Sequence, residues 1–276
     1  MRAVLTIIAL LSLWGCDNTI VPLVPGSEGH LYVYGYFDTA ADTQYVRLDA
    51  VRTSALGERE RLADLEVVSF DGSGAATAWS HTTVQLDDGR DGDVYMAPFR
   101  PRAGETYTLT ASQSDGTAST EAVVTMPGLP TLEPQRPRGD TLTLFQTVRV
   151  AGLERDPLRL TVLYDVQGFG ADEPIQFPVD YGATGSLTPG GWDLDVFLKR
   201  DHTTVVAHVN PDGSARDITL LSIGMRTELL SPEWDDPDNV QNITGGRGFL
   251  GAIGRYELTW RLESAAVETL GFLDGQ

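Results

Sequence analysis

The chain has 276 residues, with 39 acidic and 20 basic side chains and a net charge of −19 at pH 7. This acidity argues against binding nucleic acid or anionic lipid headgroups, because both carry charge of the same sign. The chain has one cysteine, so it forms no internal disulfide and its fold must be held by its core alone.

The N-terminus has the pattern of a bacterial lipoprotein signal peptide. Arg2 precedes the apolar residues 4–14, a run shorter than the roughly 20 residues of a membrane-spanning helix but as long as a secretory core segment. The Leu-Trp-Gly before Cys16 is similar to a lipobox, which implies cleavage after residues 1–15 and acyl chains on the Cys16 sulfur. The alternative is an ordinary signal peptide or N-terminal anchor with an incidental cysteine.

The first part of the mature chain predicts a tether followed by a β-sandwich. Residues 16–27 form the tether, because the segment is rich in proline and glycine and has no amphipathic period. Apolar and polar residues then alternate in short segments separated by turn signals, which is typical of a sandwich domain over 28–127. These segments are 30–37, 43–51, 65–70, 94–99, 107–111 and 119–127.

The proline-rich stretch 128–140 has no strand pattern and predicts the boundary to a second domain. Beyond it, alternation resumes in several segments and ends with the long strand-like run 254–267. We therefore expect an all-β protein with two β-sandwich domains, over 28–127 and 128–276, after a cleaved lipoprotein signal peptide. Helix is expected only as a turn or two around residues 225–231.

Residues 246–251, GRGFLG, match the glycine pattern of dinucleotide-binding loops. That fingerprint needs a helix after the glycines and an acidic residue about 20 positions later. Only 25 residues follow Gly251, and they alternate like a strand. We therefore expect no cofactor, and we interpret the glycines as serving a bulge or a tight loop with positive φ.

Histidines and acidic loops are the candidate metal ligands. His202 and His208 lie six residues apart in an expected strand, roughly 20 Å apart at ~3.3 Å per residue, so they predict surface positions rather than one metal site. Calcium prefers six to eight oxygen ligands from carboxylate-rich loops. Two loops offer such carboxylates, although hairpin turns have the same composition. The acidic residues are Asp87, Asp88, Asp91 and Asp93 in the first loop, and Glu233, Asp235, Asp236 and Asp238 in the second.

Several segments in order resemble an uncharacterised family of bacterial lipoproteins, the domain of unknown function 4249. The resemblance rests on the lipobox, on LYVYGYF followed by YVRLDAV, on AGETYTLTA and VTMPGLPTLE, and above all on NVQNITGGRGFLGAI. It implies an outer-membrane lipoprotein with an immunoglobulin-like first domain. It also implies a TonB-dependent transporter as partner, and it carries over no catalytic residue.

We expect a non-enzymatic protein, anchored to the outer membrane through lipidated Cys16, that binds a partner or ligand at the cell envelope. Whether it faces the periplasm or the cell surface stays open. The expected contact residues are aromatic or arginine side chains near loops, namely Trp192, Trp234, Arg247 and Phe249. The alternative for each tryptophan is core packing. The alternative functions are a structural envelope protein and a surface glycan hydrolase, which would need two carboxylates about 5–10 Å apart in a cleft.

Overall fold

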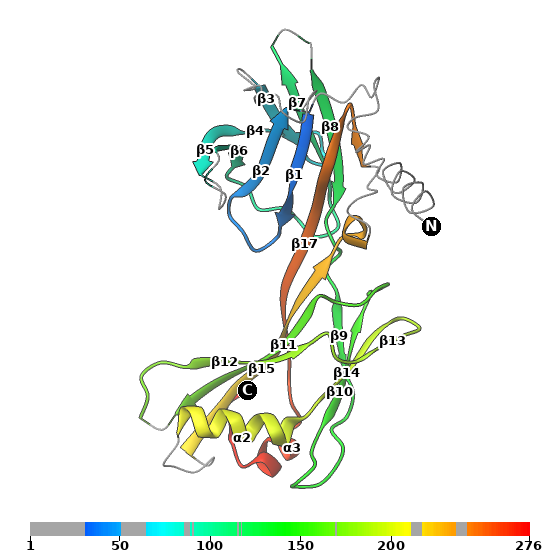
Figure 1. Cartoon of the computed structure of the whole chain (residues 1–276). Helices are drawn as coiled ribbons and strands as arrows, with labels where there is room; N and C mark the ends of the chain where they lie inside the picture. Colours follow the sequence, from blue (N-terminus) through cyan, green and yellow to red (C-terminus); the bar gives the residue numbers. More distant parts are fainter. Residues whose placement is uncertain are drawn as a thin grey trace, which may run out of the picture.

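A computed structural model describes residues 31–50, 65–85, 89, 91–114, 116, 118–168, 170–210, 217–235 and 242–276. Two lobes stand one above the other, joined at a narrow waist (Figure 1). Strands make up most of both lobes, so the predicted all-β class is confirmed. Cys16 and the tether lie outside the described residues, and the immunoglobulin-like character and the signal peptide stay predictions.

The first lobe is a sandwich of two sheets. One layer has the strand order β17-β1-β2-β6-β5 and belongs to a nine-stranded sheet, while the other layer is β16-β8-β7-β3-β4. Their strands alternate between side chains that face the partner layer and side chains that face outward. The bounds are β1 Leu31–Asp38, β2 Gln44–Ala50, β3 Leu65–Phe70, β4 Ala76–Ala78, β5 Ser80–Gln85, β6 Asp91–Ala97, β7 Thr106–Gln113, β8 Ser119–Thr125 and β16 Ile243–Thr244.

The second lobe combines strands with two helices. Its first sheet continues the nine-stranded sheet in the order β12-β11-β15-β17, and its second is β13-β14-β10-β9. In Figure 1, α2 and α3 lie below β12, β11 and β15 and to the left of β10 and β14. The strands are β9 Thr131–Pro134, β10 Gln146–Ala151, β11 Arg159–Gly168, β12 Ile175–Gly182, β13 Ser186–Thr188, β14 Gly191–Val196, β15 Ile218–Leu230 and β18 Leu273–Asp274. The helical segments are α2 Leu198–Val209, the 3₁₀ turn η3 Pro232–Asp235 and α3 Ser264–Leu270.

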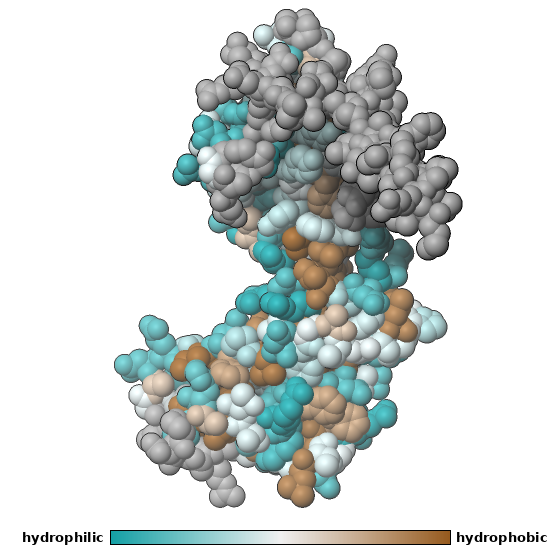
Figure 2. Space-filling model, in the orientation of Figure 1, coloured by the Kyte–Doolittle hydropathy of each residue, from teal (hydrophilic) through white to brown (hydrophobic). Residues whose placement is uncertain are grey.

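The strand β17, Gly246–Trp260, runs through both lobes. Residues 246–253 pair with β1 in parallel, and residues 253–260 pair with β15 in antiparallel fashion. Accordingly, Leu250 and Ala252 pack in the core of the first lobe, while Tyr256 and Trp260 pack in the core of the second. Hydrophobic residues form a band where β17 passes the waist (Figure 2). The domain boundary near residue 128 stays a prediction.

Helix lies where the sequence predicted strand. The helix α2 replaces the strand expected through His202 and His208, because Leu198, His202 and Val205 repeat at helical spacing and face the core, although its Thr and Val residues favour strands locally. The prediction of helix at 225–231 is wrong, since residues 225–230 lie in β15 between β11 and β17. Part of the long strand expected over 254–267 is the start of α3. No helix in the described part of the chain is long and apolar enough to cross a bilayer.

Candidate functional site

The outward face of β1 carries a row of tyrosines. Leu31, Val33 and Phe37 point inward and are fully buried, whereas Tyr34 and Tyr36 point outward and are each 44% exposed. Burying a large aromatic side chain is favourable, so folding alone does not explain why these rings are exposed. Exposed apolar patches of this kind mark interaction surfaces. We use the name aromatic face for this row and its ring neighbours, which are Tyr32, Tyr34, Tyr36, Tyr45, Trp234 and Phe249.

Strand pairing places the members of the aromatic face side by side. The register sets Tyr36 opposite Tyr45 of β2, whose side chain is 55% exposed. It sets Tyr34 between Arg47 of β2 and Phe249 of β17. Cross-strand neighbours of this kind lie within contact distance, so one continuous surface spans β2, β1 and β17.

The rings of the aromatic face contact one another. Tyr32 and Tyr34 stack with centroids 5.8 Å apart at 17°. Trp234 lies at the end of the row, 4.7 Å from the Phe249 centroid and 5.9 Å from that of Tyr36. Offset or edge-on ring contacts at these distances add about 0.5–1.5 kcal/mol each beyond the burial of area.

Trp234 is fixed over β17 by one hydrogen bond and one glycine. Its indole Nε1 donates to the Ala252 carbonyl at 3.1 Å. A Cβ on Gly251 would lie 2.7 Å from the same Nε1 and 2.6 Å from Phe249 Cζ, so only glycine leaves room for both rings. The 3₁₀ turn η3 thus holds the tryptophan against the sheet without burying it in a core.

Polar groups are interleaved with the rings. Arg47 forms an ion pair with Asp49 at 2.5 Å, on the strand beside Tyr34. Partial burial and the neighbouring Tyr32 raise the pKa of Tyr34, against the opposing effect of Arg47, so its phenol stays neutral at physiological pH. Tyr34, Tyr36 and Tyr45 are each at least 44% exposed, so a partner can reach these side chains.

The structure brings together three of the four expected contact residues. Trp234 and Phe249 touch each other, and Arg247 is paired in register with Tyr32 on the same face. Trp192 instead lies in the core of the second lobe, 5% exposed, where its Nε1 donates to the Thr184 carbonyl at 3.0 Å. The sequence analysis missed the tyrosines as contact residues, although the alternation in LYVYGYF already placed three of them on one strand face.

The expected metal ligands are dispersed. Asp87, Asp88, Asp236 and Asp238 lie outside the described residues. Asp93 pairs with His81 at 3.0 Å, while Asp91 begins β6. Asp235 pairs with Arg155 at 2.8 Å, and the neighbouring Glu233 lies on η3. Within the described ranges, no three or more acidic, histidine or cysteine side chains gather so that they could hold a metal ion.

The glycine motif and the two helix histidines serve packing. GRGFLG lies inside β17, where Gly248 has a φ of 115°, so positive φ is confirmed at that residue. His202 and His208 lie on α2 rather than on a strand, which corrects the expected strand. His202 is buried, so its expected surface position is wrong, whereas His208 is exposed as expected. His202 is 7% exposed and packs edge-on against Phe272, while His208 packs against Phe177.

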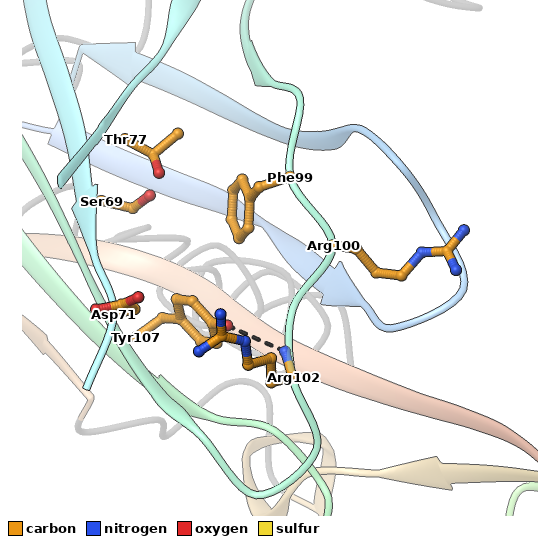
Figure 3. A pocket seen from close by; sticks show the side chains of 7 residues that line it. All are labelled: Ser69, Asp71, Thr77, Phe99, Arg100, Arg102 and Tyr107. Atoms are coloured by element: carbon orange, nitrogen blue, oxygen red, sulfur yellow. Dashed lines mark hydrogen bonds between the residues drawn. The ribbon is translucent and has the colours of Figure 1, made fainter. Parts of the chain in front are cut away.

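A small polar hollow opens at one end of the first lobe (Figure 3). It encloses about 130 Å³ and lies between the β3–β4 hairpin and the segment after β6. The Arg102 backbone N–H donates to the Tyr107 hydroxyl at 3.0 Å, and that hydroxyl donates to Glu105. Arg100 points away from the other lining residues and pairs with Asp42 at 2.5 Å. Because its volume lies below the range of about 300–1,000 Å³ typical of ligand pockets, the hollow does not compete with the aromatic face.

Residues 17–170 match the family described as Domain of unknown function (DUF4249), a segment that covers more than half of the chain. No curated protein matches the chain. The match begins directly after Cys16 and includes β1 and β2, which carry the four tyrosines of the aromatic face.

Proposed function

We propose, from the premise that the chain belongs to the DUF4249 family, that it is a non-catalytic binding protein that captures a partner protein on its aromatic face. The observation that carries the proposal is the row of half-exposed rings on a sheet whose opposite side is fully buried. Exposed aromatic side chains beside arginine are the usual anchors of protein interfaces.

The rigidity of the sheet supports binding. Strands on both sides of β1 hold its backbone, and ring contacts of Tyr34 with Tyr32 and of Tyr36 with Trp234 restrain the side chains. These tyrosines therefore lose less conformational freedom when a partner covers them. Tyrosine also offers a polar hydroxyl together with an apolar ring, which lets such a surface stay in water before binding. The face therefore suits a partner that presents apolar side chains and a few hydrogen-bonding groups.

We further propose that lipid on Cys16 anchors the protein to the outer membrane and that the partner is an outer-membrane barrel of the TonB-dependent transporter class. The resemblance of the sequence to its family supports this choice. The net charge of −19 disfavours a direct contact of the globule with anionic headgroups, so the lipid and a protein partner are the expected attachments.

Hydrolysis of glycans receives less support. Asp193 and Asp195 line one hollow of the second lobe, but Asp193 is held by Arg149 through two hydrogen bonds of 2.7 and 3.0 Å. The hydrogen bond from Arg149 lowers the pKa of Asp193, whereas a glycosidase needs one carboxyl with a raised pKa as its acid. This favours the non-catalytic proposal over the hydrolase.

The test is a pull-down of the full chain through a C-terminal tag from gently solubilised membranes. We expect a barrel to co-purify with the wild type in near-equal amount and to be lost with Trp234→Ala and with Tyr45→Ser. The control is Leu142→Ser, since Leu142 is 78% exposed in the second lobe.

Two outcomes would contradict the proposal. Undiminished capture by a folded Tyr45→Ser chain would place the partner elsewhere on the surface. If the Trp234→Ala chain unfolds, this tryptophan is needed for core packing. The test then depends on Tyr45→Ser, because Tyr45 is the most exposed ring of the aromatic face. If no protein co-purifies with the wild type, the proposal fails.

A further inference from the structure

The second lobe has a hollow on the outward face of the sheet β13-β14-β10-β9. Along β14, Trp192, Leu194 and Val196 point into the core, so Asp193 and Asp195 point outward. The hollow has a volume of about 510 Å³, within the range of about 300–1,000 Å³ typical of ligand pockets. Its lining is Thr147, Thr184, Gly185, Ser186, Asp193, Leu194, Asp195 and Phe197.

An exposed phenyl ring stands at the edge of this hollow. Phe197 is 46% exposed, although it lies between a buried strand and a buried helix end. The Arg200 guanidinium lies 5.1 Å from its centroid, and the backbone N–H of Phe197 donates to the Tyr181 hydroxyl at 2.8 Å. Arg200 is itself tied to the fully buried Asp201 at 3.0 Å. The contact with Arg200 restrains the phenyl ring, and the exposed part of the ring remains accessible to a ligand.

The polar groups of the hollow complement hydroxyls. Asp195 accepts a hydrogen bond from Thr147 Oγ1 on one carboxylate oxygen, at 2.6 Å, and its other oxygen has no partner among the described residues. The Ser186 hydroxyl likewise bonds no described residue. Arg149 balances the charge of Asp193, so Asp195 is the one lining carboxylate without a cationic partner among the described residues. This charge disfavours an anion and offers a strong acceptor to hydroxyl groups.

We propose that this hollow is a binding site for a neutral saccharide, whose ring packs its apolar face on Phe197 while its hydroxyls donate to Asp195. A flat apolar surface beside acceptors and hydroxyls matches a pyranose, which has C–H groups on its faces and hydroxyls around its edge. The site binds without cleaving, since it lacks the paired acid described above. It is separate from the aromatic face and does not rest on the proposed partner.

The experiment is calorimetric titration of the purified full chain with three probes, maltohexaose, cellohexaose and xylohexaose. We expect at least one to bind. Phe197→Ala should weaken that binding roughly three- to tenfold, as for the loss of one ring contact. Asp195→Asn should weaken it about tenfold, because a charged acceptor is lost while the amide can still meet Thr147.

Two controls separate this proposal from the other one. Leu187→Ala changes a half-exposed side chain of the same sheet outside the lining, and Tyr45→Ser changes the aromatic face; both should leave saccharide binding unchanged. Thermal unfolding of each variant shows whether α2 is intact, and Ser186→Ala replaces Phe197→Ala if the latter unfolds. Failure of all three probes to bind, or binding insensitive to both Asp195→Asn and the ring or serine variant, overturns the proposal.

Discussion

Two pairs of tyrosines, one in each lobe, lie in opposite environments. In the second lobe, Tyr164 is fully buried and Tyr181 nearly so, and their hydroxyls donate to Asp201 at 3.0 and 2.6 Å. In the first lobe, Tyr34 and Tyr36 are each 44% exposed. In the second lobe the tyrosine hydroxyls thus connect the sheet to α2 through Asp201. In the first lobe the tyrosine side chains are accessible to a partner.

The comparison teaches how to separate a structural from a functional aromatic residue in this fold. Burial raises the pKa of Tyr164 well above its ordinary value, and the adjacent carboxylate of Asp201 raises it further, so this phenol is a permanent donor to Asp201. A buried hydroxyl without such a partner would be costly, whereas water satisfies an exposed one. Removing the hydrogen-bond partner of a tyrosine hydroxyl should therefore lower the free energy of unfolding strongly in the second lobe. The corresponding change at the exposed tyrosines of the first lobe should have little effect on that free energy.

The largest expected effect is that of Asp201→Ala. The variant leaves the hydroxyls of Tyr164 and Tyr181 without their acceptor and removes the partner of Arg200. We expect the free energy of unfolding to fall by about 3–5 kcal/mol, as for one partner removed from a buried charged network. Urea denaturation followed by circular dichroism measures the change.

Tyr181→Phe is the matched variant, because it removes one hydroxyl and keeps both the ring and the carboxylate. Its cost should be smaller, about 1–3 kcal/mol. If Asp201→Ala proves no worse than a surface substitution, the buried network does not hold α2, and the contrast between the lobes breaks.

The next effect is pH-dependent and arises from His202. This histidine is 7% exposed, and neither ring nitrogen has a hydrogen-bond partner among the described residues. Burial, with a smaller contribution from Lys199, lowers its pKa to about 4 from 6.5. Below pH 6.5 the unfolded chain therefore binds a proton that the folded chain refuses, so stability is full above pH 6.5 and falls as the pH drops toward 4. The loss is at most about 3 kcal/mol.

Urea titrations at several pH values check this expectation. His202→Leu fills a similar volume without a titratable group, so the difference in unfolding free energy between variant and wild type should grow as the pH falls from 6.5 to 4. His208→Gln is the control on the same helix. Parallel pH profiles for the wild type and His202→Leu would show that another group dominates.

The smallest effect is expected at the aromatic face, from Gly251→Ala. The new Cβ would meet Phe249 and Trp234 at 2.6 and 2.7 Å, so both rings must shift. Because these atoms are the far ends of side chains rather than backbone, we expect a cost of only about 1–2 kcal/mol. Capture of the partner should fall together with stability, since the indole leaves its bond to Ala252.

Gly72→Ala is the control for Gly251→Ala, because a Cβ at Gly72 meets its nearest atom at 3.6 Å. Urea denaturation and the pull-down are applied to both variants. If Gly251→Ala leaves the free energy of unfolding unchanged and the variant still captures the partner, the position of Trp234 is not needed for partner binding.

Much of the first lobe follows from local pattern. The alternation in LYVYGYF and in YVRLDAV predicted strands that the structure contains as β1 and β2, and a strand with one buried face necessarily shows its other residues outward. The joining of β1 with β17 could not be read in this way, because that parallel pairing links residues more than 200 positions apart. The aromatic face depends on this pairing for Phe249 and Trp234.

The second lobe was less predictable because tertiary packing overrode local preference. Residues 198–209 contain adjacent Thr and Val residues that favour a strand, yet they form α2, whose buried face includes Asp201 and His202. Because Asp201 and His202 are polar, the sequence pattern does not predict that they belong to the buried face of a helix. The hydroxyls of Tyr164 and Tyr181, brought from β11 and β12, and the guanidinium of Arg200 compensate the burial of the Asp201 carboxylate.

The sequence by itself determined the all-β class, the family and the alternation that places three tyrosines on one face of β1, because strand geometry has a period of two wherever a core exists. The tertiary structure alone decided which aromatic residues meet. It buried Trp192 in the second lobe, set Trp234 over Gly251, and left Phe197 at the edge of a polar hollow. These outcomes depend on contacts between distant segments, which no local period encodes.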